Sequence, residues 1–342
     1  MTAGRVTWQV KAPEPQVGAA FRYAALADLA PLDAQLGVRA PVSVPEGLDD
    51  PLFGPDALGC EGQHLNTYAV LDAAKLSLLP DMIEAAGTPH ACLFQGEAAE
   101  TLRESAPWLV ALSRDDRLTR ALMTDCAGPI GLWAHDLGLI IRCAASFEAM
   151  CKHLRRFVRL RDAGADAWYY FRFWERHVPL GLASAEAAEP QALAQALIAP
   201  IDGAAQSWIM IDPFENQGHV LALQDTPADR IGVPALSSAT VAALEHCTAQ
   251  AQMRSEIHDT LNAVPEAVRD TCIADPRLAR LWQVLHDTKV TERDQRIEAM
   301  QGYLRLTFAG QEDRAWDILN TMEQGPKIRL WHLSQALEAV AA

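Results

Sequence analysis

Histidine and cysteine lie close together at two places in the sequence, and both side chains can bind metals or take part in catalysis. His90 and Cys92 alternate along an expected strand, so both point to one face and could supply two metal ligands. A buried cysteine beside a partly exposed histidine is the more ordinary interpretation. Cys151 and His153 stand two apart on an expected helix and point apart, which disfavours a shared metal. Cys126 could act as a nucleophile with a distant histidine.

Positive charge is concentrated between Lys152 and Arg161, a segment that also contains Arg155, Arg156 and Arg159. Such a cluster could bind phosphate or nucleic acid, or it could dock an acidic protein surface. A solvated helix face is the more ordinary interpretation. We take Arg155, Arg156 and Arg159 as candidate protein-binding residues.

Aromatic side chains form a second run at residues 168–174 and recur singly toward the C-terminal end. The run could stack nucleic-acid bases, but alternation along one long strand explains it better. Trp282, Tyr303 and Trp331 are candidate interface anchors, because large aromatic residues are common hot spots of protein interfaces. Core positions are the ordinary alternative for tryptophans such as Trp282, Trp316 and Trp331.

The common catalytic motifs are missing from this sequence. It has neither G-x-x-x-x-G-K-[ST] nor G-x-G-x-x-G, and it lacks G-x-S-x-G, H-E-x-x-H and C-x-x-C. Enzymes that carry these motifs are thereby disfavoured, whereas a site assembled from scattered residues is not. We expect no enzyme, cofactor or resident metal. The alternative is an α/β enzyme with a dispersed, hydrolase-like site that uses Cys126 or His90.

Short apolar runs alternate with helical stretches in the middle of the chain, which indicates an α/β lobe with a mixed sheet flanked by helices. The expected strands are residues 68–73, 90–94, 108–112, 137–142 and 168–174, followed by a hairpin of 207–211 with 219–223. The expected helices are residues 78–86, 97–105, 117–124 and 146–161. The last of these has an apolar face, and Ser146 is its expected N-cap.

The two ends of the chain differ from this middle part. Residues 1–60 are rich in proline, and we expect an extended lead-in with one helical piece near residues 17–29. Residues 61–235 form the expected α/β lobe, and residues 236–342 an α-helical lobe. The helices expected there are residues 238–251, 255–262, 265–273, 276–286, 292–308, 312–321 and 327–339.

Composition narrows the class of protein further. Half of the 342 residues are hydrophobic, and the net charge of −15 disfavours a general nucleic-acid binder. The seven cysteines are odd in number and lack close pairs, which argues against a disulfide framework. The N-terminal segment has no signal-peptide core, and no apolar run reaches 18 residues. We therefore expect a cytoplasmic protein without a membrane partner.

Several segments, taken in order, resemble one known family. They are residues 68–75 with 78–81, 92–96, 106–110, 117–120, 154–161 and 168–173. No single segment is specific, but their order and spacing together resemble the domain of unknown function 4123 family, the adaptor chaperones of bacterial type VI secretion effectors. The resemblance covers about residues 61–180.

The resemblance implies a function. Such proteins bind a toxic effector in the producing cell and help to load it onto the VgrG spike. It implies two partners, a cognate effector and VgrG, and it places effector choice in the more divergent C-terminal part. The long proline-rich lead-in departs from the family pattern and leaves the role of residues 1–60 open.

Overall fold

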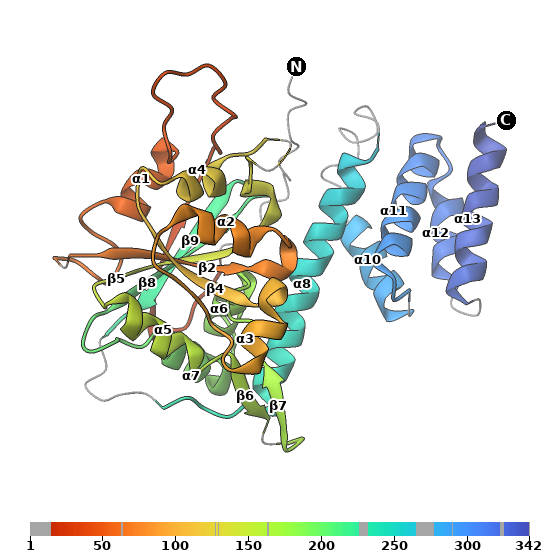
Figure 1. Cartoon of the computed structure of the whole chain (residues 1–342). Coiled ribbons are helices and arrows are strands. Elements are labelled where there is room, and N and C mark those ends of the chain that lie inside the picture. Colours follow the sequence, from red (N-terminus) through yellow and green to blue (C-terminus); the bar gives the residue numbers. More distant parts are fainter. Residues whose placement is uncertain are drawn as a thin grey trace. The chain divides into compact units, whose positions relative to one another are not determined.

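The computed structural model describes residues 15–62, 64–126, 128, 130–162, 164–225, 232–264, 277–288, 290–321 and 325–341. These residues divide into two compact units. The first, called the sheet unit, extends to Cys247, and the second, the helical unit, begins at Thr248. Figure 1 shows the elements of each unit.

One seven-stranded sheet forms the centre of the sheet unit, in the order β1-β9-β8-β5-β2-β4-β3. The strands are β1 (Phe21–Leu26), β2 (Asn66–Asp72), β3 (His90–Cys92), β4 (Pro107–Leu112), β5 (Gly138–Cys143), β8 (Gln206–Asp212) and β9 (Gln217–Leu223). The predicted sheet flanked by helices is confirmed, but all neighbouring strands are antiparallel and not mixed. Alternating strands and helices do not fix strand direction, which depends on which strands become neighbours. Here β2 pairs with β4 and β5, and not with β3.

Helices cover both faces of the sheet, and the alternation of side chains along each strand divides the core into two clusters. On β2, Tyr68 and Val70 face the first cluster, whereas Ala69 and Leu71 face the second. The first is covered by α5 (Phe147–Arg155), α6 (His177–Ala183) and α7 (Ala188–Ile198). The second is covered by α1 (Glu46–Phe53), α2 (Leu79–Ala86) and α4 (Arg117–Met123). In Figure 1, α1, α2 and α4 lie above the sheet, and α5 and α7 lie below it.

Short helical segments complete this unit. They are α3 (Glu97–Thr101) and the 3-10 turns Ala73–Lys75, Arg103–Ser105 and Trp133–His135. The predicted helix at 97–105 is therefore interrupted, because the chain tightens from α3 into a 3-10 turn before β4.

Residues 15–60 are part of the sheet unit, and the helix predicted at 17–29 is wrong. Residues 21–26 form β1, which pairs along its whole length with β9. This long-range pairing overrides a weak local helical preference. Helix α1 buries Leu48 and Leu52, and the buried Arg142 of β5 donates hydrogen bonds to the carbonyl oxygens of Pro51 (2.9 Å) and Gly54 (2.7 Å).

A second correction concerns the predicted helix at 146–161 and the long strand at 168–174. Helix α5 ends at Arg155, and β6 (Arg159–Asp162) pairs with β7 (Ala167–Tyr170) as a separate hairpin. The Asp162 Oδ1 atom accepts hydrogen bonds from the backbone N–H groups of Gly164 and Ala165, a turn that reverses the chain. The helical spacing of apolar residues continues through Phe157 and Val158, beyond the end of α5, and so concealed that end.

The helical unit consists of stacked helices. They are the later part of α8 (Ser238–Asn262), then α10 (Arg277–Asp287), α11 (Arg293–Phe308), α12 (Glu312–Asn320) and α13 (Pro326–Ala341). The two helices predicted at 238–251 and 255–262 are one continuous helix, and the helix predicted at 265–273 lies outside the described residues. At the centre of this unit the buried Glu256 carboxylate accepts hydrogen bonds from Arg296 Nε (2.8 Å) and from Trp282 Nε1 (2.6 Å).

Candidate functional site

Helix α5 carries the predicted basic cluster and packs on one end of the sheet. The Ser146 hydroxyl caps the helix by accepting a hydrogen bond from the Ala149 N–H (3.2 Å), as predicted. Met150, Cys151 and Leu154 are buried against the first core cluster. This packing fixes the direction of the helix and leaves Lys152 exposed on its outer side.

Strand β3 is the edge of the sheet beside this helix. The Leu93 N–H donates to the Pro107 carbonyl and the Ala111 N–H to the Pro89 carbonyl, so Ala91 directs its backbone groups toward β4. The backbone groups of His90 and Cys92 therefore point away from the sheet. On that open side, Arg155 Nη2 donates a hydrogen bond to the Cys92 carbonyl oxygen (2.8 Å).

Two adjoining hollows lie along this edge, and we call them together the edge groove. The larger has a volume of about 540 Å³, and the smaller about 180 Å³. The larger is lined by Ala91, Gln95, Phe147, Glu148, Cys151, Lys152, Arg155 and Arg156. The smaller is lined by Leu93, Phe94, Gln95, Ala98, Arg155, Val158, Arg159 and Tyr170. Because both contain Gln95 and Arg155, they form one continuous depression with apolar, partly aromatic and basic walls.

The β6–β7 hairpin forms the end of the edge groove and carries three neighbouring exposed aromatic side chains. Trp168, Tyr169 and Tyr170 are 62%, 46% and 50% exposed. The Arg159 guanidinium carbon lies 5.2 Å from the centre of the Trp168 ring and 5.7 Å from that of Tyr170, at cation–π distance. Tyr170 also contacts Phe94, with ring centres 5.7 Å apart, which joins the hairpin to the groove.

The three arginines predicted as protein-binding residues come together at this groove, although not on one helix face. Arg155 is the last residue of α5, Arg156 caps the helix, and Arg159 begins β6. Arg156 stacks on Phe157 at 5.6 Å. The helix end and the hairpin together therefore bring these residues to one groove, which a continuous helix would not have done.

The three predicted aromatic anchors of the helical unit lie in different environments. Trp282 and Tyr303 are buried in its core, because they fill the space between α10, α11 and their neighbours, and their side chains are not presented to a partner. Trp331 on α13 is 58% exposed, and Ile328 one turn earlier is 50% exposed. Of the three residues, Trp331 alone stays a candidate anchor.

Four of the histidines and cysteines considered for chemistry, namely His90, Cys92, Cys151 and His153, have packing or hydrogen-bond partners. The His90 imidazole is within 2.8 Å of the Thr88 carbonyl oxygen, and burial raises the pKa of the Cys92 and Cys151 thiols. His153 contacts the Leu197 carbonyl oxygen through Nε2 (2.8 Å). In the described part of the chain, no three His, Cys, Asp or Glu side chains are placed to hold a metal ion.

A cluster that the sequence did not indicate lies at one end of the central strands, and we call it the arginine–aspartate cluster. Asp72 ends β2, Asp136 lies just before β5, and Asp212 ends β8. Since these strands are antiparallel neighbours, the three carboxylates lie at the same end of the sheet. Arg172 and Arg176, from the segment that leads into α6, reach across to them.

The contacts within the arginine–aspartate cluster are short. Arg176 Nη1 is 2.6 Å from Asp212 Oδ2, and its Nε is 3.1 Å from Asp136 Oδ1. Arg172 Nη2 is 2.6 Å from Asp72 Oδ2. Burial lowers the pKa of Arg176, but Asp136 and Asp212 outweigh it and the net shift is upward. Burial raises the pKa of Asp72, although Arg172 opposes this shift.

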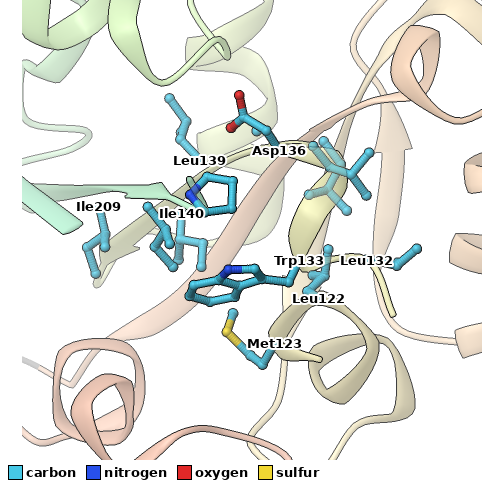
Figure 2. A pocket seen from close by; sticks show the side chains of 13 residues that line it. Leu122, Met123, Leu132, Trp133, Asp136, Leu139, Ile140 and Ile209 are labelled. Carbon is cyan, nitrogen blue, oxygen red and sulfur yellow. The ribbon is translucent and has the colours of Figure 1, made fainter. Parts of the chain in front are cut away.

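A small apolar cavity lies next to this cluster, and Figure 2 shows the residues that line it. Its volume is about 50 Å³, far below the several hundred Å³ of a ligand pocket. In Figure 2 the Asp136 carboxylate points away from the Trp133 ring that forms one wall. That carboxylate is bound by Arg176 and by Lys75 Nζ (3.4 Å). The cluster therefore acts in this arrangement as a structural tie between strands and α6.

The sheet unit is thus an antiparallel α/β layer structure with a basic and aromatic groove at one edge. Residues 67–193, which include β2 to α7, match the model of the family described as Domain of unknown function (DUF4123). The resemblance noted from the sequence is therefore confirmed over these residues, as a match to that family's model. This family is associated with adaptors of type VI secretion effectors.

Other comparisons give no further relative. No curated protein and no solved structure matches the chain. Among the described residues, no helix is long and apolar enough to cross a membrane.

Proposed function

We propose that this protein is an adaptor that binds a cognate type VI effector in the cytoplasm of the producing cell and assists its loading onto the VgrG spike. The observation that carries the proposal is the match of residues 67–193 to the DUF4123 family model. The edge groove supports it, because tryptophan, tyrosine and arginine on a surface are the residue types that anchor protein interfaces.

The test is co-purification from cells that co-express a tagged form of this chain, the product of the neighbouring candidate effector gene and VgrG. We expect the effector to be retained by the tagged chain, and VgrG to join when all three are present. An unrelated effector of similar size and charge is the matched control. A chain that retains neither the effector nor VgrG would contradict the proposal.

We further propose that the protein acts by binding, without catalysis. Effector delivery by Cys126→Ala and His90→Ala variants should then equal delivery by the unaltered chain. A loss of delivery in a variant that still folds and still binds the effector would instead favour a dispersed catalytic site.

Effector choice is proposed to lie in the helical unit. Leu244 and Cys247 of α8 belong to the core of the sheet unit, so a chain that ends at residue 247 keeps that core complete. We expect such a truncated chain to fold and to lose most of its effector binding. Full effector binding by the truncated chain would show instead that the sheet unit selects the effector.

A further inference from the structure

We infer that the edge groove binds an extended, acidic segment of a partner protein whose carboxylates flank an apolar side chain. This inference rests on the proposed adaptor function, and it adds the binding surface and the chemistry of the segment that fits it. It is carried by the charges, the shape and the exposed aromatic residues of the groove.

Three of the four basic side chains that line the groove have no carboxylate partner in the part of the chain that the structure describes. Among the described residues, no ion pair involves Lys152, Arg155 or Arg159. Glu148 is the only carboxylate that lines either hollow. In a chain with a net charge of −15, a groove with this many unneutralised cations is complementary to carboxylates.

The shape of the groove favours an extended segment. The two hollows follow one another along the sheet edge, with an apolar base formed by Ala91 and Cys151 in the first and by Leu93 and Val158 in the second. An apolar side chain of the partner would be buried on this base, while acidic residues on either side would reach Lys152 and Arg159. The aromatic hairpin then packs on the end of the segment.

Arg155 determines how the segment is held. Its hydrogen bond to the Cys92 carbonyl oxygen covers the outward-facing acceptor of β3. Simple addition of a partner strand to this edge would require that bond to break, and charged side chains at edges oppose such pairing. The groove therefore recognises side chains rather than the partner's main chain.

The experiment uses the full-length chain and three fluorescein-labelled nine-residue peptides. The first has a central leucine flanked on both sides by aspartate and glutamate. The second replaces the acidic residues by asparagine and glutamine, and the third replaces the leucine by glycine. Fluorescence polarisation should show that the first peptide binds about tenfold more tightly than either of the others.

Protein variants locate the site. Lys152→Glu combined with Arg159→Glu should weaken binding of the first peptide at least about tenfold. Arg39→Glu, at an exposed cation of the same unit outside the groove, makes the same charge change as Arg159→Glu alone, so it is the control for that single variant and should have less than a twofold effect. Arg159→Gln removes the charge but keeps an unbranched polar side chain, so it tests the proposed ion pair with less disturbance of the hairpin than a charge reversal.

Three outcomes would overturn the inference. They are equal binding of the acidic and amide peptides, an equal effect of Arg39→Glu, and tighter binding of a labelled oligothymidine than of the acidic peptide. Failure of the inference is separable from failure of the adaptor function. If an effector co-purifies equally with the unaltered chain and with the Lys152→Glu, Arg159→Glu chain, the adaptor function stands. The groove is then not the site that binds the partner.

Discussion

Arg176 holds together three separate parts of the sheet unit, and replacing it by methionine should destabilise that unit strongly. Its guanidinium bridges Asp212 at the end of β8 and Asp136 before β5. Arg176 itself is the N-cap residue of α6. The Arg176 side chain is 11% exposed and that of Asp212 only 3%. Methionine preserves much of the side-chain volume, so the change removes mainly the charge and the hydrogen bonds.

The expected loss of stability in Arg176→Met follows from the two carboxylates that lose their partner. Removing one partner of a buried ion pair costs about 3–5 kcal/mol, because the other charge stays buried without compensation. In the Arg176→Met variant, Asp212 is the charge that stays buried without an ion-pair partner. The N–H groups of Phe214 and Glu215 still donate to its Oδ1 atom. Asp136 is 17% exposed and keeps Lys75, so its contribution is smaller. We expect a loss of about 3 kcal/mol, which is about 6–12 °C in Tm for a unit of this size.

The assay is urea unfolding, followed by circular dichroism and by calorimetry so that the transition of the sheet unit is separated from that of the helical unit. Arg176→Lys is the matched control. A lysine keeps the charge but lacks the planar guanidinium whose separate nitrogens reach Asp212 and Asp136, so the lysine variant should lose some stability, though less than the methionine variant.

A double variant tests the cause of the loss. Asp212→Asn in the Arg176→Met background should recover about 1 kcal/mol or more, because it removes the uncompensated charge. The reasoning is refuted if Arg176→Met costs less than about 1 kcal/mol, or if the Asp212→Asn and Arg176→Met losses simply add.

Three further predictions concern other buried groups. Burial, together with Arg176, lowers the pKa of His177 to about 4 and outweighs the opposing effect of the Asp136 carboxylate. The unfolded chain therefore binds a proton near pH 6.5 that the folded chain does not, and the free energy of unfolding should fall by about 2 kcal/mol from pH 6.5 to 5. His177→Gln should flatten this dependence, and an unchanged pH profile would contradict it. In the helical unit, Glu256→Ala should cost about 3–5 kcal/mol, measured by urea unfolding, whereas Glu256→Leu with Arg296→Met should recover most of that loss. Burial raises the pKa of the Cys60 and Cys143 thiols to about 12 and about 11, so Ellman's reagent should modify them only after denaturation; rapid reaction of the native chain would show that they are accessible.

The central strands and the first half of α5 could be predicted because local pattern and final environment agree. Residues 68–71 are continuously apolar, as expected for a strand covered on both faces, and β2 is buried there on both sides. Ser146 caps α5 as its position before an amphipathic run indicates. The hairpin of β8 and β9 was also predicted, since its two apolar runs flank the Asn216 turn.

The errors arose where distant pairing or a single turn decides the structure. Residues 21–26 become a strand because β9 offers them a partner about 200 positions later in the chain, which no local pattern can show. The β6–β7 hairpin depends on the turn at Asp162, whose side chain accepts hydrogen bonds from two backbone N–H groups in an Asx-type turn. The signal that could have revealed this turn is Asp162 followed shortly by Gly164.

The candidate site illustrates why clustering of charge in a sequence is an incomplete guide to function. The arginines of greatest structural consequence, Arg142 and Arg176, lie outside the basic cluster at residues 152–161, and no pattern in the sequence singles them out. Inside the unit, the Arg142 guanidinium donates hydrogen bonds to carbonyl oxygens, and the Arg176 guanidinium forms ion pairs with carboxylates. Lys152 and Arg159, in contrast, have no ion pair among the described residues. Charge that the fold leaves unneutralised is charge available to a partner, and it is found at the edge groove beside exposed aromatic side chains. The presence of these cations beside exposed aromatic side chains is the physical reason to expect partner binding at the edge groove.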